Sequence, residues 1–138
     1  MLRFKSHKAL DNLRILVADD HEVVTRGVSS ILSARKDVEV IDDAQDGRKA
    51  IEKAREANPD LIILDITMPV LDGFSAAKEI RGFLPKVPIL FLSMHEGRHI
   101  EEQAKSVGAQ GFVRKAEAGA DLLNAVDCVL RNETFFRT

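Results

Sequence analysis

The stretch LIILDITMPVLDG, Leu61 to Gly73, carries the strongest information about the fold of this chain. Residues 61–64 are an unbroken apolar run, which is typical of a strand covered on both faces. The run ends at Asp65, and a turn with Pro69 and Gly73 follows it. We expect the proline to restrict this turn and the glycine to supply a positive φ. A half-solvated antiparallel sheet is excluded by the missing polar alternation.

Outward from this stretch, short apolar runs alternate with segments whose apolar residues recur at helical spacing. The expected strands are Leu13–Ala18, Val38–Ile41, Leu61–Asp65, Val87–Ser93 and Gly111–Lys115. A helical pattern follows each strand, and Asn58-Pro59 ends the second of these helices. Five strands alternating with five helices predict an α/β fold, in which right-handed βαβ units build one doubly wound parallel sheet.

The composition is that of one globular domain. The 138 residues are 45% hydrophobic and 30% charged, with a formal net charge of -2. Such a charge gives no bulk attraction to nucleic acid or an anionic membrane, and no apolar run approaches the roughly 20 residues of a membrane span. The single cysteine, Cys128, excludes an intrachain disulfide, and we expect an inert, buried or half-buried thiol. We therefore expect a cytoplasmic protein with no membrane partner.

Polar side chains stand at the ends of four of the expected strands. They are Asp19 and Asp20 after the first strand, Asp65 ending the third, Ser93 ending the fourth, and Arg114-Lys115 ending the fifth. Because the carboxyl ends of parallel strands share one edge of the sheet, these groups are expected to line a single crevice. Capping of the first helix by Asp19 or Asp20 is the structural alternative for those two residues.

Carboxylates gathered in this way repel one another, and a hard divalent cation relieves the repulsion. Mg²⁺ takes oxygen ligands from one or two carboxylates, water and phosphate. Such a site supports phosphoryl transfer, and a carboxylate can itself attack phosphorus to form an aspartyl phosphate. The ammonium of Lys115 and the hydroxyl of Ser93 could then bind the phosphate oxygens. His21, His95 and His99 are expected to be exposed residues and not ligands of a transition metal.

The motifs LVADDHE, LDITMPVLDG, LSMHE and GAQGFVRK occur in this order between residues 16 and 115. Together they resemble the receiver domains of bacterial two-component response regulators, over about Leu13 to Leu130. The stretches DDHEVVTRGV and GFVRKAEAGADLLNAV are most similar to the NarL/FixJ branch. The resemblance implies a flavodoxin-like sheet with strand order 2-1-3-4-5. Ala116 departs from many receivers, which have proline there, although NarL-like receivers often lack it.

By this resemblance, Asp65 is the phospho-acceptor and Lys115 the lysine that contacts the phosphate. Asp20 would bind Mg²⁺ directly, Asp19 would act mainly through water, and Thr67 would offer its backbone carbonyl. Asp65 itself completes the metal ligands. The protein would thus be a signalling domain with self-catalysed phosphotransfer and dephosphorylation, and not a conventional enzyme.

Two further residues match the switch of the family. Ser93 corresponds to the hydroxyl that moves toward the phosphoryl group, and Phe112 to the aromatic residue whose ring turns inward with it. For Phe112, a static core aromatic remains the alternative interpretation.

The resemblance also implies partners and boundaries. A sensor histidine kinase would supply the phosphoryl group, and a homodimer is possible. Residues 1–12 would form an N-terminal arm, residues 13–131 the receiver, and residues 132–138 a tail or the start of a linker. DNA would be bound, and transcription controlled, only through an output domain that this sequence lacks, and we favour a shortened regulator over a stand-alone receiver.

Two other classes of function remain open. A haloacid-dehalogenase-type phosphatase also combines an aspartate nucleophile with Mg²⁺, but it needs an acid where this chain has Thr67. A pseudo-receiver would be a constitutive interaction module, which the complete acidic pocket disfavours.

Overall fold

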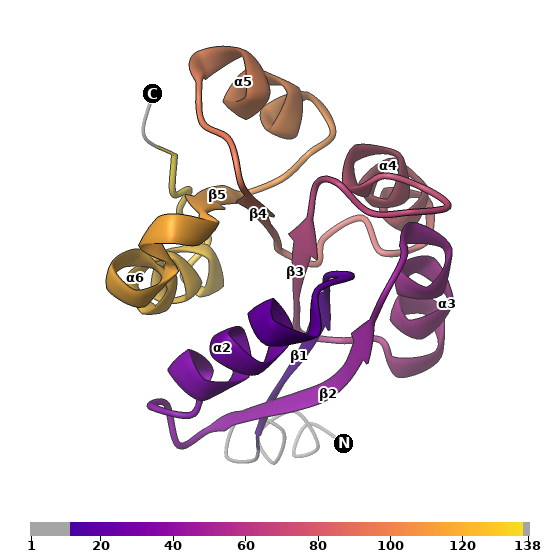
Figure 1. Ribbon diagram of the computed structural model, residues 1–138. Helices are drawn as coiled ribbons and strands as arrows, with labels where there is room; N and C mark the ends of the chain where they lie inside the picture. Colours follow the sequence, from indigo (N-terminus) through magenta and orange to yellow (C-terminus); the bar gives the residue numbers. More distant parts are fainter. Residues whose placement is uncertain (1–11, 137–138) are drawn as a thin grey trace.

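A computed structural model describes residues 12–136, in which one sheet of five parallel strands is surrounded by helices (Figure 1). The strands are β1 (Leu13–Ala18), β2 (Val38–Ala44), β3 (Leu61–Asp65), β4 (Ile89–Ser93) and β5 (Gly111–Arg114). The helices are α2 (Glu22–Leu32), α3 (Gly47–Ala57), α4 (Gly73–Phe83), α5 (Arg98–Ser106) and α6 (Ala118–Leu130), with the short 3-10 helix η1 (Lys115–Glu117) before α6. The strand order is β2-β1-β3-β4-β5, which confirms the doubly wound sheet.

Three strand boundaries differ from those expected. β2 continues beyond Ile41 to Ala44, past an irregularity in its pairing with β1. β4 begins only at Ile89, since Pro88 has no N–H to donate and the carbonyl of Val87 accepts a side-chain hydrogen bond instead. β5 ends at Arg114, because Lys115 already belongs to η1.

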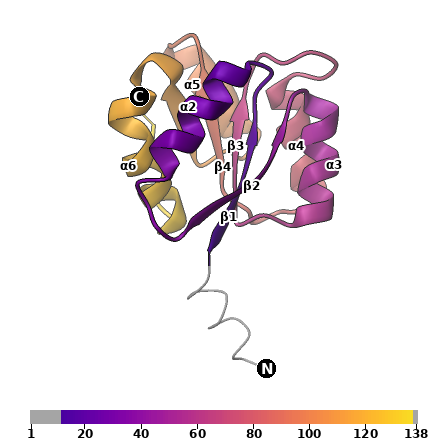
Figure 2. The ribbon, with the colours of Figure 1, turned by 60° about the horizontal axis from the view of Figure 1, so that its bottom comes forward.

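Helices cover both faces of the sheet, which explains the continuous apolar runs of β3 and β4 (Figure 2). Alternate residues of each strand point to opposite faces. Ile15 and Ile63 therefore pack in the cluster that contains residues of α2 and α6. Leu16 and Leu64 pack in the other cluster, with residues of α3, α4 and α5. This two-sided burial holds the carboxyl ends of the central strands in fixed positions.

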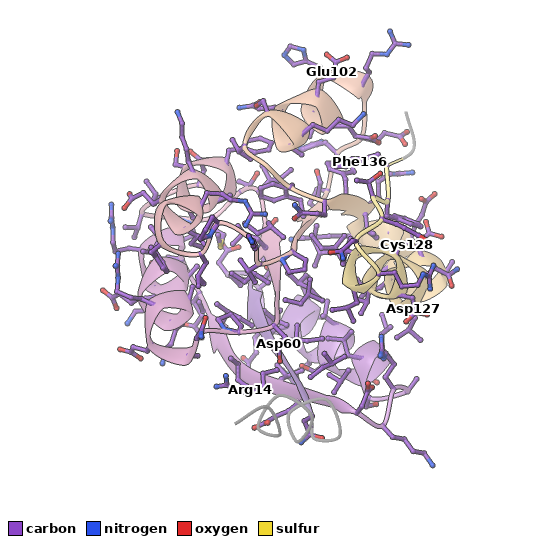
Figure 3. All side chains as sticks on the ribbon, turned by 180° about the vertical axis from the view of Figure 1, so that it is seen from behind. Arg14, Asp60, Glu102, Asp127, Cys128 and Phe136 are labelled. Carbon is purple, nitrogen blue, oxygen red and sulfur yellow. The ribbon has the colours of Figure 1, made fainter. Side chains whose placement is uncertain are left out.

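A hydrogen bond joins the starts of two central strands. Figure 3 shows Arg14 and Asp60 at the end where β1 and β3 begin, and the Arg14 amide donates to the Asp60 carboxylate at 2.8 Å.

Cys128 is half-buried on α6, as expected. No helix in the described range, residues 12–136, is long and apolar enough to cross a membrane.

A half-buried guanidinium joins two loops at the same end of the sheet. Arg81, near the end of α4, donates to the carbonyls of Leu84, Val87 and Gly108 at 3.0, 2.6 and 2.7 Å. It also donates to Oε1 of Gln110 at 2.9 Å. Burial lowers the pKa of the Arg81 guanidinium. These hydrogen bonds hold the loops before β4 and β5 in register.

Replacing Arg81 with methionine should destabilise the fold by about 2–4 kcal/mol, because three half-buried carbonyls lose their donor at once. Urea denaturation followed by circular dichroism measures the effect. Arg48→Met is the matched control, since Arg48 reaches Glu79 only at 3.5 Å and both side chains are about half exposed. The control should change stability by no more than about 0.5 kcal/mol. Equal losses in the two variants would contradict the structural role of Arg81.

Candidate functional site

Acidic side chains meet where the neighbouring strands β1 and β3 end. Asp19 directly follows β1, and Asp65 is the last residue of β3. One potential ligand atom from each of Asp19, Asp20, His21 and Asp65 lies within 4.8 Å of all the others. Asp19 is fully buried and Asp65 is 2% exposed, whereas Asp20 lies at the surface. The parallel topology thus produces the carboxylate cluster that the strand ends indicated.

Lys115 places one cation between two of these carboxylates. Its Nζ lies 2.8 Å from Oδ2 of Asp19 and 3.2 Å from Oδ1 of Asp65. The Lys115 side chain is only 8% exposed, so the ion pairs are screened little by solvent. η1 begins at this residue and turns the chain just as β5 ends. The fifth strand therefore delivers its ammonium to the same crevice.

The charges at the site shift two pKa values. Burial raises the pKa of the Asp65 carboxyl above its ordinary 3.8, and the charge of Asp19 raises it further, against an opposing effect of Lys115. Burial alone would lower the pKa of Lys115, but hydrogen bonds and attraction from Asp19 and Asp65 outweigh it and raise the pKa above 10.5. Two buried carboxylates share one ammonium, so the pocket favours additional positive charge.

The donor set fits a hard divalent cation. Oδ2 of Asp65 is buried and has no hydrogen-bond partner among the described residues. A buried carboxylate oxygen in that condition is costly, and a bound ion or phosphoryl group would satisfy it. The oxygen donors of Asp19 and Asp20 match the preference of Mg²⁺ better than that of soft transition metals.

The loop after β3 is shaped by different residues from those expected. Gly73 does not take a positive φ. Among the glycines of residues 12–136, Gly97 and Gly108 do. Instead, a Cβ at Gly73 would lie 2.1 Å from the carbonyl oxygen of Asp65, so glycine is needed for close approach of α4 to β3. The positive φ of 69° belongs to Val70, where a β-branched side chain is strained. The expectation for Gly73 was wrong, because its tertiary contact lies outside the local turn.

The remaining predicted residues lie around the acidic cluster and not within it. Ser93 ends β4 one residue after Leu92, the register partner of Asp65, and its Oγ accepts the amide of His95 at 3.0 Å. Thr67 is exposed on the loop after Asp65. Phe112 is 2% exposed inside the core, three residues before Lys115. Its inward position agrees with both the switch and the static interpretation.

His21 is the residue that sequence reasoning placed least well. Its side chain is 62% exposed, as expected of a surface residue, yet its Nδ1 lies 3.2 Å from Oδ1 of both Asp19 and Asp20. His21, and neither aspartate, is also the N-cap residue of α2, and its backbone amide donates to Oδ1 of Asp19 at 2.8 Å. Direct adjacency to the two aspartates was the available signal. His95 and His99 are exposed and do not belong to the cluster.

The sequence matches a known protein family over nearly the whole of this fold. The model of the response regulator receiver domain matches residues 15–127, from β1 into α6. The chain belongs to this family. It is therefore a receiver domain of the two-component type, a signalling domain with the flavodoxin-like fold.

Individual relatives are consistent with the NarL/FixJ-like branch. The response regulator protein VraR of Staphylococcus aureus is 36% identical over 125 residues, which cover 90% of this chain and 59% of VraR. A LuxR-family two-component response regulator from Aurantimonas superposes with a TM-score of 0.86 at 30% identity, covering 91% of this chain and 89% of that one. The receiver domain of NarL from Mycobacterium tuberculosis gives 0.81 at 31%, with 89% and 99% covered. The chain thus spans about three-fifths of the length of VraR.

Proposed function

We propose that this receiver accepts a phosphoryl group on Asp65 from a sensor histidine kinase or a small phosphodonor, in a Mg²⁺-dependent reaction. The observation that carries the proposal is the state of the Asp65 carboxylate. Lys115 binds its Oδ1 at 3.2 Å, while its Oδ2 is buried and has no hydrogen-bond partner among the described residues. The lysine thus orients the carboxylate and leaves one oxygen for chemistry.

Asp19, Asp20 and Asp65, with the backbone carbonyl of Thr67, would hold the cation. Mg²⁺ would supply charge neutralisation for the transferring phosphoryl group. The full burial of Asp19 and its 2.8 Å contact with Lys115 favour a role through water. The surface position of Asp20, beside His21, suits direct binding of the ion.

The reaction itself needs little from the protein beyond positioning. An oxygen of Asp65 attacks phosphorus, an O–P bond forms, and the bond from phosphorus to the donor breaks with its electron pair leaving on the donor. Lys115 and the hydroxyl of Ser93 donate to the phosphate oxygens. Water later attacks the phosphorus of the aspartyl phosphate, the bond from phosphorus to the Asp65 oxygen breaks, and inorganic phosphate leaves as the carboxylate is restored.

The output of the switch follows from these contacts. Movement of Ser93 toward the phosphoryl group would shift the loop after β4 and the packing of Phe112, and thereby a surface formed by α5, β5 and α6. In a longer regulator with receiver residues 13–131, this surface would control dimerisation and a DNA-binding output domain in the cytoplasm, and hence transcription. The part of VraR beyond its match to this chain leaves room for such a domain.

Incubation with acetyl phosphate and Mg²⁺ tests the proposal. Intact mass spectrometry should show the addition of one phosphoryl group, and reduction with borohydride should map the label to the peptide containing Asp65. Chelation of Mg²⁺ should prevent labelling, and Asp20→Asn should lower its rate strongly. A label on another residue, or labelling that is insensitive to chelation, would refute the assignment. Steady turnover of a phosphate monoester would instead support the phosphatase alternative.

A further inference from the structure

After α6 the chain turns back and runs along the free edge of β5. Asn132 takes a positive φ of 65°, and the amide of Glu133 donates to the carbonyl of Cys128 at 2.9 Å. Residues 133–136, here called the C-terminal strap, then lie between α5 and α6 (Figures 1 and 3). Figure 3 shows Phe136 at this position, beside the edge of the sheet.

Backbone hydrogen bonds join the C-terminal strap to β5. The amide of Phe135 donates to the carbonyl of Gln110 at 2.9 Å, and the amide of Phe112 donates to the carbonyl of Phe135 at 3.0 Å. Phe135 thereby forms a parallel bridge with Gly111. β5 pairs with β4 on its other side, so the strap satisfies an amide that the sheet leaves unpaired.

The two phenylalanines of the C-terminal strap straddle the edge of the sheet. Phe135 packs against the cluster that contains Val129, and Phe136 packs against the opposite cluster, which contains Phe112. Nζ of Lys105, on α5, lies 4.9 Å from the centre of the Phe136 ring, within the range of a cation–π contact. Side chains on both faces therefore hold the strap in one register.

β5 connects this docking to the acidic pocket over a short distance. The strand has four residues, with Phe112 bonded to the strap near its start and Lys115 bound to Asp19 and Asp65 just after its end. Three residues of strand span about 10 Å. Phe112 is also buried in the cluster on which Phe136 packs. A shift of Lys115 toward a phosphoryl group would therefore displace Phe112, the hydrogen-bond partner of the strap. It would also change the apolar surface on which Phe136 packs.

We infer that the outer edge of β5 is a strand-docking surface whose occupant is the chain's own C-terminal strap, and that phosphorylation weakens this docking. The coupling rests on the proposed function of Asp65. Hydrogen bonds weaken steeply as their geometry departs from the optimum, so displacement of Phe112 favours release of the strap. Release would free the edge of β5 and the faces of α5 and α6 beside it. The receiver would thereby change its C-terminal surface without any change in its sheet order.

Amide hydrogen exchange measured by NMR on the whole chain tests the docking. Phe135→Pro removes one donor of the strap, and the Phe112 amide should then exchange about ten-fold faster or more. Thr134→Ala, an exposed neighbour, should leave this amide protected. The Ile62 amide, which donates to the carbonyl of Pro88 at 3.0 Å, away from the strap, reports whether the fold is intact.

The outcomes are decisive in each case. Unchanged protection of Phe112 in Phe135→Pro would overturn the docking. If the Ile62 amide also loses protection, Phe136→Ser decides, because it keeps every backbone donor and removes only the apolar packing of the ring. Faster exchange of Phe112 alone in that variant supports the docking, and unchanged exchange overturns it.

The coupling is tested on the wild-type chain with acetyl phosphate and Mg²⁺, with mass spectrometry of the same sample. Labelled protein should exchange the Phe112 amide about five-fold faster or more, and Asp65→Asn treated identically should show no change. Full labelling with unchanged exchange would overturn the coupling while leaving the phosphorylation standing. Absence of labelling would overturn the proposed function and the coupling together, and the result with Phe135→Pro would still stand for the docking.

Discussion

Replacing Asp65 with asparagine is expected to abolish phosphoryl labelling and, in the same protein without metal, to increase stability. Labelling is lost because the amide is not a nucleophile for phosphorus. Stability rises because the pocket holds two buried carboxylates against one ammonium, and the substitution leaves the balanced pair of Asp19 and Lys115 at 2.8 Å. An increase of about 1–2 kcal/mol is expected at neutral pH, after allowance for the lost contact with Lys115.

The stability gained by Asp65→Asn should depend on pH. The folded-state pKa of Asp65 is raised above its ordinary value of 3.8, first by burial and then by the charge of Asp19. The folded protein therefore binds more protons than the unfolded chain, and wild-type stability falls as pH rises through that raised pKa. The advantage of Asp65→Asn should be absent below about pH 4 and grow toward neutral pH.

Urea denaturation from pH 3 to 8 with a chelator present measures the difference. Ser30→Ala, a substitution at an exposed side chain of α2, serves as a control that should show no comparable pH dependence. Added Mg²⁺ should stabilise the wild type more than Asp65→Asn, because binding to the folded state adds to its stability. Lower stability of Asp65→Asn across the whole range would contradict the account of the pocket.

Replacing Lys115 with methionine is expected to destabilise the metal-free fold by about 2–4 kcal/mol at neutral pH and to slow phosphorylation severely. The side chain is 8% exposed and contacts both Asp19 and Asp65, which are 0% and 2% exposed. Removal of one partner from a buried ion pair leaves uncompensated charge, which is far costlier than loss of a surface pair. The methionine fills most of the same volume, so packing contributes little to the change.

A second substitution separates charge from packing. Asp65→Asn in the Lys115→Met background should recover part of the lost stability, because one of the two unpaired carboxylates is then neutral. The loss in Lys115→Met should also shrink toward acidic pH, where protonation removes the same repulsion. Denaturation of the four proteins in the cycle checks both points. Strict additivity of the two substitutions would show that Lys115 and Asp65 do not interact in solution.

Much of the site could be predicted because the topology follows from local patterns. The apolar runs at residues 61–64 and 89–92 indicate strands buried on both faces, and such strands belong to a parallel sheet. In a parallel sheet every strand ends at the same edge, so Asp19, Asp65 and Lys115 had to approach one another. The rule places these residues at one edge of the sheet, and the structure sets their contacts at 2.8 and 3.2 Å.

Other features could not be read from spacing. Gly73 was expected to serve its own turn, but its lack of a side chain matters because the backbone of Asp65 passes within van der Waals distance. Helical spacing around Arg81 indicates only that the residue lies on a helix, yet its guanidinium bonds three carbonyls in two separate loops. Both roles depend on segments that are distant in sequence, and no local pattern encodes them.

The sequence by itself determined the order of the strands and helices along the chain, the buried faces of the sheet and the residues that end β1, β3 and β4. These properties depend on hydrophobic periodicity, which acts within a few residues and is visible in one dimension. Only the tertiary structure decided that Lys115 bridges two carboxylates, that one oxygen of Asp65 has no partner among the described residues, and that Phe135 pairs with the edge of β5. Those contacts arise from the way separately determined elements pack, and distances between them exist only in the folded chain.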